Sequence, residues 1–342
     1  MNNRDNKYKK QPSKPKTAPS QSQFSYTRKT VLDNLNLEPD WVKSLDKNPI
    51  KFIIQRGTPG EVFLLLKDVY GLDYNHALYR LVESGVFKQQ ALHRIANKYE
   101  NTSGLNREML FYSQLQKIHQ LVDLGSTDYL DVVKVEIVKL MNFMDDNGRF
   151  PMNYHHHAHA CNLLLDLGLV GNKIIDKAIN FIISRQRDDG GWLHRNNLPK
   201  GAKYDSAPSC IWTTAEVSLL LSKRSIFRNS EALQKSSLFL LDNYLNKNKS
   251  TLLPKADAWE CLTVNHTSEH MFAGGTLKIL NISLNAKTND PKKIKKMMKW
   301  LLEQQTEDSL FPKIANKHPI SDILVTIRTL YVIKKYFEIT QV

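Results

Sequence analysis

The chain is poor in cysteine and has no long apolar run. Its three cysteines, Cys161, Cys210 and Cys261, are far apart among 342 residues, and none forms a Cys-x-x-Cys pair. This pattern argues against a disulfide framework and a zinc ribbon. No segment approaches the roughly 20 consecutive apolar residues of a membrane helix. The first residues, MNNRDNKYKKQPSKPK, lack the apolar core of a secretory signal, so we expect a cytoplasmic protein.

Acidic residues are scarce at the N-terminus. Residues 1–30 hold eight lysines or arginines against a single acid, Asp5, and are rich in Pro, Ser, Gln and Asn. Such a segment buries too little apolar surface to offset its ordering entropy, which predicts a disordered basic tail. The tail either binds nucleic acid or an anionic surface through its positive charge, or it serves only to keep the protein in solution.

Hairpin signals are also missing, whereas apolar residues recur at helical spacing along the chain. The segment 61–70, with Val62, Leu65, Leu66 and Val69, is one example of an expected helix. The pattern predicts an all-α fold. We divide it into an N-terminal helical region and a repeat region, at residues 31–125 and 126–342.

Four helical units repeat from about residue 130. In each unit an apolar helix ends in a short polar turn, a bulky residue follows, and a second apolar helix comes next. Stacked hairpins of this kind bury a face that no hairpin buries alone. The bulky residues of the four turns are Phe150, Trp192, Leu253 and Phe311.

The turn RQRDDGGW of the second unit has a structural explanation. Gly190 and Gly191 permit a positive φ, which closes the outer helix sharply. Gln186 can bond carbonyl groups left over at the helix end, and Trp192 can cover the joint between neighbouring hairpins. We therefore interpret this stretch as a joint of the fold and not as catalytic machinery.

Three segments, FIISRQRDDGGW, FMDDNGRF and WLLEQQTEDSLF, resemble the Gln-Trp motif of the prenyltransferase and squalene cyclase repeat superfamily. The resemblance covers about residues 130–338. In addition, residues 37–125 resemble the extra N-terminal helices of small single-chain members of that superfamily. It implies an α/α toroid, with alternating inner and outer helices around a central cavity. It also implies a terpenoid cyclase-like or prenyltransferase-like protein that binds a hydrophobic or isoprenoid-type ligand there. The alternative is a non-catalytic toroidal scaffold for a protein or lipid-derived partner.

The reactive motifs of that superfamily are absent from the sequence. There is no DxDD, no DDxxD, and no Asp-x-Cys zinc motif, since Asp205 and Cys210 are separated by four residues. A phosphate loop of the GxxxxGK[ST] type is missing as well. The specific activity, and whether the chain is an enzyme, therefore stay open.

Histidines and cysteines gather near the expected starts of inner helices. In a toroid these starts meet at one rim, so zinc or another divalent metal is a candidate cofactor. The alternative is a polar loop beside cysteines that pack as small apolar residues. The candidate ligands are His157, His159, Cys161, Cys210 and His270.

Two further sets of side chains are candidates for ligand contacts. Aromatic residues can line an apolar cavity, although core packing explains the same spacing. Arginines at neighbouring turns can bind an anion, although solvated loop charge explains them equally. The aromatic set is Trp212, Trp259, Phe272 and Tyr331, and the anion-binding set is Arg149, Arg187 and Arg195.

Overall fold

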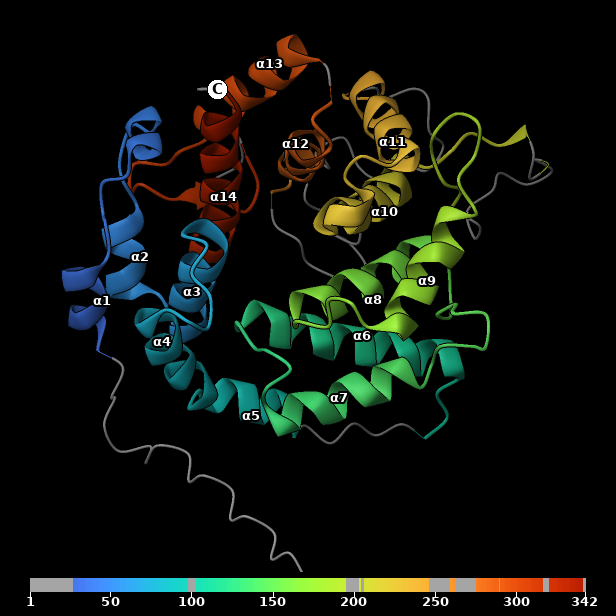
Figure 1. Ribbon diagram of the computed structural model, residues 1–342, viewed down its shortest axis with the longest axis horizontal. Coiled ribbons are helices and arrows are strands. Elements are labelled where there is room, and N and C mark those ends of the chain that lie inside the picture. The colour runs from blue at the N-terminus through green and yellow to red at the C-terminus, as the bar shows by residue number, and fades with distance from the viewer. Residues whose placement is uncertain are drawn as a thin grey trace, which may run out of the picture.

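Helices alternate between an inner and an outer ring around one centre in the computed structural model of the chain (Figure 1). This arrangement confirms the predicted all-α fold and the α/α toroid. The structure describes residues 27–97, 103–194, 203, 206–245, 259–262, 275–288, 290–315 and 320–340. The predicted residues Arg195, Leu253, His270 and Phe272 lie outside these ranges, as do residues 1–26 of the predicted tail.

The four predicted repeat units each supply an outer helix followed by an inner one. Inner helices α8, α10 and α12 are buried over most of their length, whereas outer helix α9 buries one face through Ile175, Ile179 and Ile182. This contrast is the one expected of a helix inside a ring and a helix on its surface. The pairs are α7 (Asp131–Met141) with α8 (Tyr154–Asp166), α9 (Lys173–Ile183) with α10 (Ile211–Lys223), α11 (Glu231–Asp242) with α12 (Gly275–Ala286), and α13 (Pro291–Leu302) with α14 (Ile323–Thr340). A 3-10 turn, η5 (Ser225–Phe227), follows α10.

The residues before the repeats are helical as well. Their α3 begins with a capping box, in which Thr58 and Glu61 bond each other's backbone N–H groups, and with Pro59 in its first turn. The expected helix 61–70 is divided, because α3 runs into a π-helical turn, η2. The elements are α1 (Arg28–Asn34), η1 (Asp40–Ser44), α2 (Ile50–Arg56), α3 (Pro59–Leu64), η2 (Leu65–Val69), α4 (Ala77–Phe87), α5 (Gln90–Ala96) and α6 (Arg107–Asp123). Since α1 begins at Arg28, the last residues of the segment predicted as a tail are helical.

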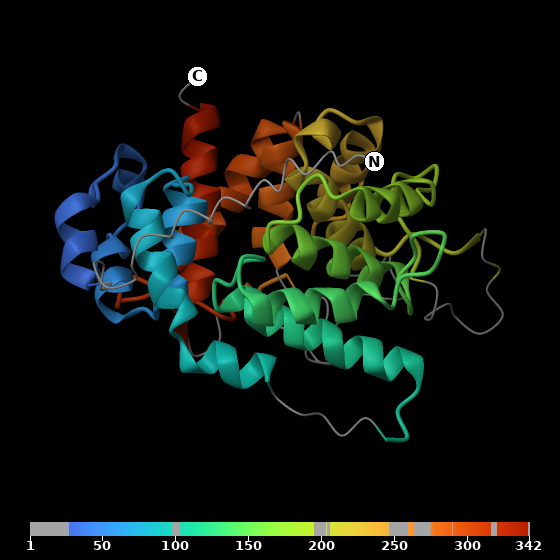
Figure 2. The same ribbon diagram turned by 60° about the horizontal axis from the view of Figure 1, so that its bottom comes forward.

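The N-terminal elements complete the ring of inner helices. Helix α6 packs on α8, α10 packs on α8 and α12, α12 packs on α14, and α14 packs on η2. We call the set α3 with η2, α6, α8, α10, α12 and α14 the inner ring. Figure 1 shows these helices around the centre of the molecule, and Figure 2 shows the same helices from another side. The division of the chain near residue 126 stays a prediction.

Two close contacts join the first part of the chain to later parts. The backbone of Gly60 lies so near Leu124 that a Cβ added to the glycine would be 2.1 Å from the leucine carbonyl oxygen. On the other side of η2, Lys334 Nζ donates to the carbonyl oxygen of Val69 at 2.8 Å. Glycine is therefore needed at position 60 for α3 to reach the end of α6.

The turns between outer and inner helices share one hydrogen bond. In three of them the N–H of the bulky residue donates to a side chain at the start of the next inner helix. Phe150 donates to His157 Nδ1 at 3.1 Å, Trp192 to Thr214 Oγ1 at 3.0 Å, and Phe311 to Thr326 Oγ1 at 2.9 Å. All three bulky side chains are fully buried.

The stretch RQRDDGGW is built by local bonds of the same kind. Asp189 Oδ1 accepts from the N–H of Gly191 and from the hydroxyl of Ser209. Gln186 Nε2 donates to the carbonyl oxygens of Gly190 and of Ala232 on the next outer helix. Gly190 has a φ of +85°, which other residues rarely adopt. The side chains of Gln186 and Asp189 thus both have structural partners in the turn.

A short antiparallel pair, β1 (Phe311–Pro312) with β2 (Ser321–Asp322), precedes α14. Two residues per strand carry no alternating pattern, which is why the sequence did not predict it. Within the described part of the chain, no helix combines the length and the apolar character that crossing a membrane requires.

Candidate functional site

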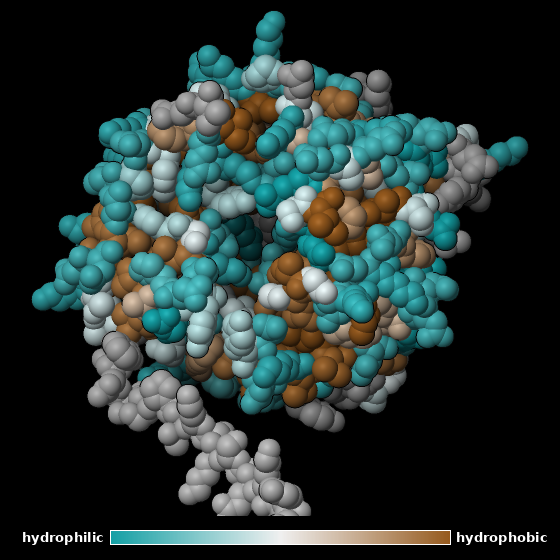
Figure 3. Space-filling model, viewed as in Figure 1, coloured by the Kyte–Doolittle hydropathy of each residue, from teal (hydrophilic) through white to brown (hydrophobic). Residues whose placement is uncertain are grey.

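A central cavity of about 390 Å³ lies inside the inner ring. Every member of the inner ring contributes to its wall, and the volume is within the range of small-molecule sites. Figure 3 shows a hollow at the middle of one face of the molecule with hydrophilic residues around it. The fold therefore brings residues from distant parts of the chain to one cavity.

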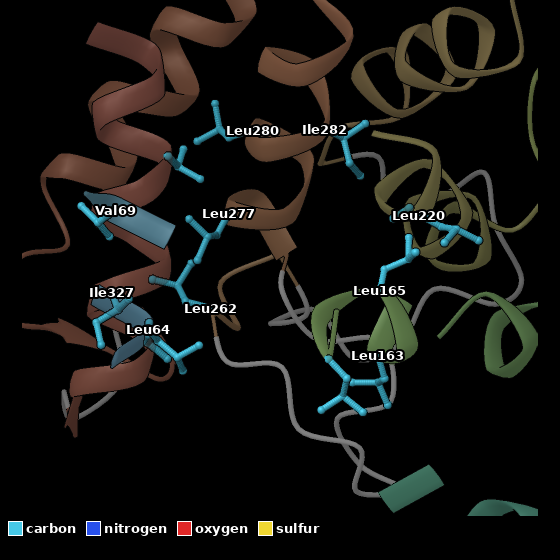
Figure 4. Close-up of a cluster of buried hydrophobic side chains, with 14 of the residues drawn as sticks. Leu64, Val69, Leu163, Leu165, Leu220, Leu262, Leu277, Leu280, Ile282 and Ile327 are labelled. Atoms are coloured by element: carbon cyan, nitrogen blue, oxygen red, sulfur yellow. The ribbon is translucent and has the colours of Figure 1, made fainter. Parts of the chain in front are cut away.

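Part of the cavity wall is apolar. Figure 4 shows aliphatic side chains from opposite sides of the ring arranged around a common space. They supply the kind of surface that holds a hydrocarbon chain away from water. The labelled side chains that line the cavity are Leu64, Leu163, Leu165, Leu262, Leu277 and Ile327.

The rest of the wall is strongly charged. This differs from the apolar cavity that the resemblance led us to expect. Two of the bases, Lys67 and Arg228, donate to backbone carbonyl oxygens, those of Asp166 and Ser222. The basic lining residues are Lys67, Lys223, Arg228, Lys278 and Arg328, and the acidic ones are Asp68, Asp123, Asp166 and Glu216.

A continuous chain of polar contacts crosses the cavity wall through five helices. Arg328 donates to Asp123 Oδ1 at 2.6 Å, and His119 Nε2 lies 3.2 Å from Asp123 Oδ2. His119 Nδ1 lies 3.2 Å from His159 Nε2. His159 Nδ1 lies 2.9 Å from Glu216 Oε1, and Lys278 Nζ lies 2.7 Å from Glu216 Oε2. We call the four central residues, Asp123, His119, His159 and Glu216, the relay.

Both carboxyl groups of the relay are held in the ionised form. Burial alone would raise the pKa of Glu216, but Lys278 and His159 outweigh it and hold that pKa well below its usual range. Burial also opposes ionisation of Asp123, and Arg328 and His119 together lower its pKa. Buried charges persist only where such partners compensate for the loss of water.

Asp68 is the exception among the cavity acids. By surface area it is exposed to the cavity, yet protein surrounds it closely enough that desolvation raises its pKa. The positive charges of Lys67, Lys223 and Arg328 offset this effect only in part. The π-helical turn η2 positions Asp68 here, and single π-helical turns are frequent at functional sites. A carboxyl group of raised pKa in a cavity is suited to give up a proton.

Asn162 presents an unsatisfied acceptor at the same cavity. Its amide nitrogen donates to Glu216 Oε1 at 2.8 Å and to the Glu216 carbonyl oxygen at 3.1 Å. Its Oδ1 is buried without a hydrogen-bond partner, and the side chain is part of the cavity lining. A buried polar atom of this kind is expected to bond a ligand or a water molecule.

The predicted metal ligands do not converge on one point in the described residues. His157 accepts from the Phe150 N–H and its Nε2 lies 2.9 Å from the Ala178 carbonyl oxygen, so both ring nitrogens serve the turn. Cys161 and Cys210 are fully buried, and burial raises the pKa of both thiols. Among the described residues there is no group of three or more His, Cys, Asp or Glu side chains arranged to hold a metal ion. Of the set, His159 alone is placed in the cavity wall by the structure, and His270 lies outside the described residues.

The predicted cavity aromatics are divided between the core and the cavity. Trp212 and Trp259 pack on each other in the core with ring centroids 4.9 Å apart, and Tyr244 packs on Trp259. Neither tryptophan belongs to the lining of the central cavity, whereas Tyr331 does. The structure thus places the two tryptophans in a packed aromatic cluster with Tyr244, and Phe272 lies outside the described residues.

The predicted anion-binding arginines serve their own turns. Arg149 donates to the carbonyl oxygen of Met152 at 3.3 Å, and Arg187 donates to that of Ala207 at 2.8 Å. These bonds explain both residues without an anion, and Arg195 lies outside the described residues. The cations that face the cavity are others.

The sequence contained a signal for the residues that it did not nominate. Glu216 and Lys278 are each the single charge within an otherwise uncharged stretch of an inner helix, IWTTAEVSLLL and GTLKILNISL. Charged residues are almost never fully buried without a partner, so each predicts a partner across the ring. His119 carries a weaker signal, because its helix is polar on several sides.

Comparison with known proteins gives structural similarity without sequence matches. No protein-family model and no curated protein matches this sequence. A type II terpene cyclase, MstE from Scytonema, is similar with a TM-score of 0.44 and 12% identity, over 82% of this chain and 88% of that one. A variant of MstE in complex with its substrate, geranylgeranyl dihydroxybenzoate, gives 0.42 and 12%, over 81% and 86%. A protein from Actinoplanes gives 0.41 and 12%, over 81% and 89%.

Proposed function

We propose that the chain is a toroid of the terpene cyclase type that binds an amphiphilic, isoprenoid-like molecule in its central cavity and transfers a proton to it. The observation that carries this proposal is the composition of the cavity wall. Aliphatic side chains and charged side chains face the same cavity. A ligand with a hydrocarbon part and a polar head satisfies both.

The charges favour an anionic head group. Lys67 and Arg228 line the cavity but are bonded to backbone carbonyl oxygens, so neither is neutralised by those contacts. Lys335, beside Tyr331, has its pKa lowered to about 8 by burial and by the charge of Arg228. A phosphate or carboxylate head relieves this concentration of positive charge.

Asp68 supplies the proton in this proposal. Its carboxyl group faces the cavity, and its raised pKa keeps a larger share of it protonated near neutral pH than that of an ordinary aspartate. The alternative, a non-catalytic scaffold for a protein or lipid-derived partner, predicts a filled or shallow centre, and the cavity of about 390 Å³ favours the proposal of a ligand in the cavity.

Binding is tested by calorimetry with three probes, namely farnesyl diphosphate, farnesol and inorganic pyrophosphate. We expect the first to bind at least tenfold more tightly than either part alone. Leu277→Trp fills the cavity and should abolish binding, whereas Leu238→Trp, on the outer surface of α11, should leave it unchanged. Equal binding to the Leu277→Trp variant would place the ligand elsewhere and contradict the proposal.

Proton transfer is tested separately in D₂O. Isoprenoid substrates incubated with the protein should give products that carry deuterium at carbon, detected by mass spectrometry. Asp68→Asn should abolish incorporation while farnesyl diphosphate still binds. Incorporation that survives in the Asp68→Asn variant would assign the proton to another group.

A further inference from the structure

The outer nitrogens of the relay histidines have their roles fixed by the neighbouring carboxylates. Asp123 and Glu216 are ionised and can only accept hydrogen bonds. His119 Nε2, 3.2 Å from Asp123, and His159 Nδ1, 2.9 Å from Glu216, therefore carry the hydrogens of these two contacts. In a neutral imidazole the other nitrogen then carries no hydrogen and can only accept a hydrogen bond.

Two ring nitrogens without hydrogen atoms would therefore face each other at the centre of the relay. His119 Nδ1 and His159 Nε2 are 3.2 Å apart, which is a hydrogen-bond distance. If both rings were neutral, the lone pairs of these two nitrogens would point at each other and repel. The contact becomes a hydrogen bond when one ring holds a second proton.

We infer that His119 and His159 together hold one proton more than two neutral rings, and that the relay is a proton-transfer site in the wall of the central cavity. The substrate class is a ligand whose oxygen atom, in a hydroxyl, carboxylate or phosphate group, reaches the wall. Transfer breaks one N–H bond and forms one O–H bond. Proton transfer in the reverse direction restores the relay. The inference rests on the geometry of the rings and not on the proposed function.

The position of the extra proton follows from the surroundings of the two rings. Burial, opposed by Glu216, lowers the pKa of His159 to about 4, which disfavours a second proton on that ring. His119 lies beside Asp123, whose side chain is 25% exposed, while Glu216 at the other end is 2% exposed. Protons therefore enter and leave at the Asp123 end. The groups that face the pair are Asp123 on α6, His155 and His156 on α8, Glu216 on α10, Lys278 on α12 and Arg328 on α14.

Nitrogen-15 NMR of histidine-labelled, full-length protein at pH 7 tests this inference. We expect one buried ring with both nitrogens protonated, joined through Nδ1 to a neutral ring. His119→Gln should remove that imidazolium signal, whereas His93→Gln, on the exposed side of α5, should not. Spectra in which every buried ring is neutral would overturn the inference.

Asp123→Asn provides a second test that keeps the size and hydrogen-bonding capacity of the side chain. Loss of the carboxylate charge should remove the imidazolium signal of the histidine pair at pH 7, with the far-UV circular dichroism unchanged. Elemental mass spectrometry of protein purified without chelators gives the competing outcome. A stoichiometric metal that is lost in His119→Gln would make the pair a metal site and overturn the proton assignment. Failure to bind farnesyl diphosphate would leave this inference untouched, so the two proposals fail separately.

Discussion

The backbone N–H of Trp192 donates to the hydroxyl of Thr214, and equivalent bonds join Phe150 to His157 and Phe311 to Thr326. Three of the four joints of the toroid, those of the first, second and fourth units, thus use a side chain from the first turns of the inner helix to hold the bulky residue that precedes it. The recurrence explains why a histidine at position 157 need not be a metal ligand.

Thr214→Val tests the importance of this bond. Valine has the shape of threonine but no acceptor, so the buried N–H of Trp192 loses its partner. We expect a loss of about 1–3 kcal/mol in the free energy of unfolding, measured by urea denaturation. Thr214→Ser keeps the hydroxyl and should lose clearly less. Equal losses in both variants would show that packing of the methyl group, and not the bond, is what counts.

Glu216→Gln should be strongly destabilising. Glu216 is the carboxylate that compensates Lys278 and accepts from His159 in the interior. Removing one partner of a buried ion pair typically costs about 3–5 kcal/mol, because the other charge stays buried. Glu231→Gln on the surface of α11, which breaks the exposed pair with Lys235, is the matched control and should be neutral.

The double variant Glu216→Gln with Lys278→Met separates charge from shape. The double variant leaves no lysine charge buried without a partner. It should therefore be more stable than Glu216→Gln alone. Urea denaturation of the four proteins gives the coupling energy. Additive losses would mean that the two side chains act independently.

The stability of the fold should fall as the pH falls from about 6.5 toward 4. Burial lowers the pKa of His156 to about 3 and those of His157 and His159 to about 4, and it lowers that of His155 well below the usual value of 6.5. In this window the unfolded chain binds protons that these folded histidines do not, which favours unfolding. Each contributes up to about 1.4 kcal/mol per pH unit. Urea midpoints at pH 8, 7, 6 and 5 measure the effect, and a flat profile below pH 6.5 would contradict it.

Gly60→Ala should weaken the closure of the inner ring. The new Cβ would lie 2.1 Å from the Leu124 carbonyl oxygen, so the backbone has to shift, at a cost of about 2–3 kcal/mol. Gly104→Ala is the control, because its Cβ meets nothing within 4 Å although φ is +81°. The strain of that φ alone is about 1–2 kcal/mol. Thermal unfolding of both variants makes the comparison, and a smaller loss at Gly60 would be unexpected.

The fold was predictable because its signals are local. Helical periodicity and the repeated bulky residue after a polar turn define each helix pair, and the structure has these pairs where Phe150, Trp192 and Phe311 predict them. The path of η2 was not predictable. A π-helical turn at Leu65–Val69 depends on packing against α14, which is more than 250 residues away in sequence.

The candidate site was predictable only in part, because it depends on pairing across the ring. His159 stood out as one histidine of a run, and Tyr331 as an aromatic residue on the last helix. The partners of His159, which are His119 and Glu216, come from 40 and 57 residues away and follow no spacing rule. The two tryptophans could not be assigned from the sequence, because aromatic residues at helical spacing fit a core as well as a cavity.

The contact between Lys334 and Val69 spans 265 positions of the chain. Lys47 and Gln305 likewise exchange backbone and side-chain hydrogen bonds over 258 positions. Contacts of such long range form late, since a long loop must close before they contribute. During synthesis, the helix pairs that form first leave apolar surface exposed to solvent until α14 has been made. Helix α14 therefore completes the inner ring, and a chain that stalls before it leaves apolar surface exposed, which favours aggregation.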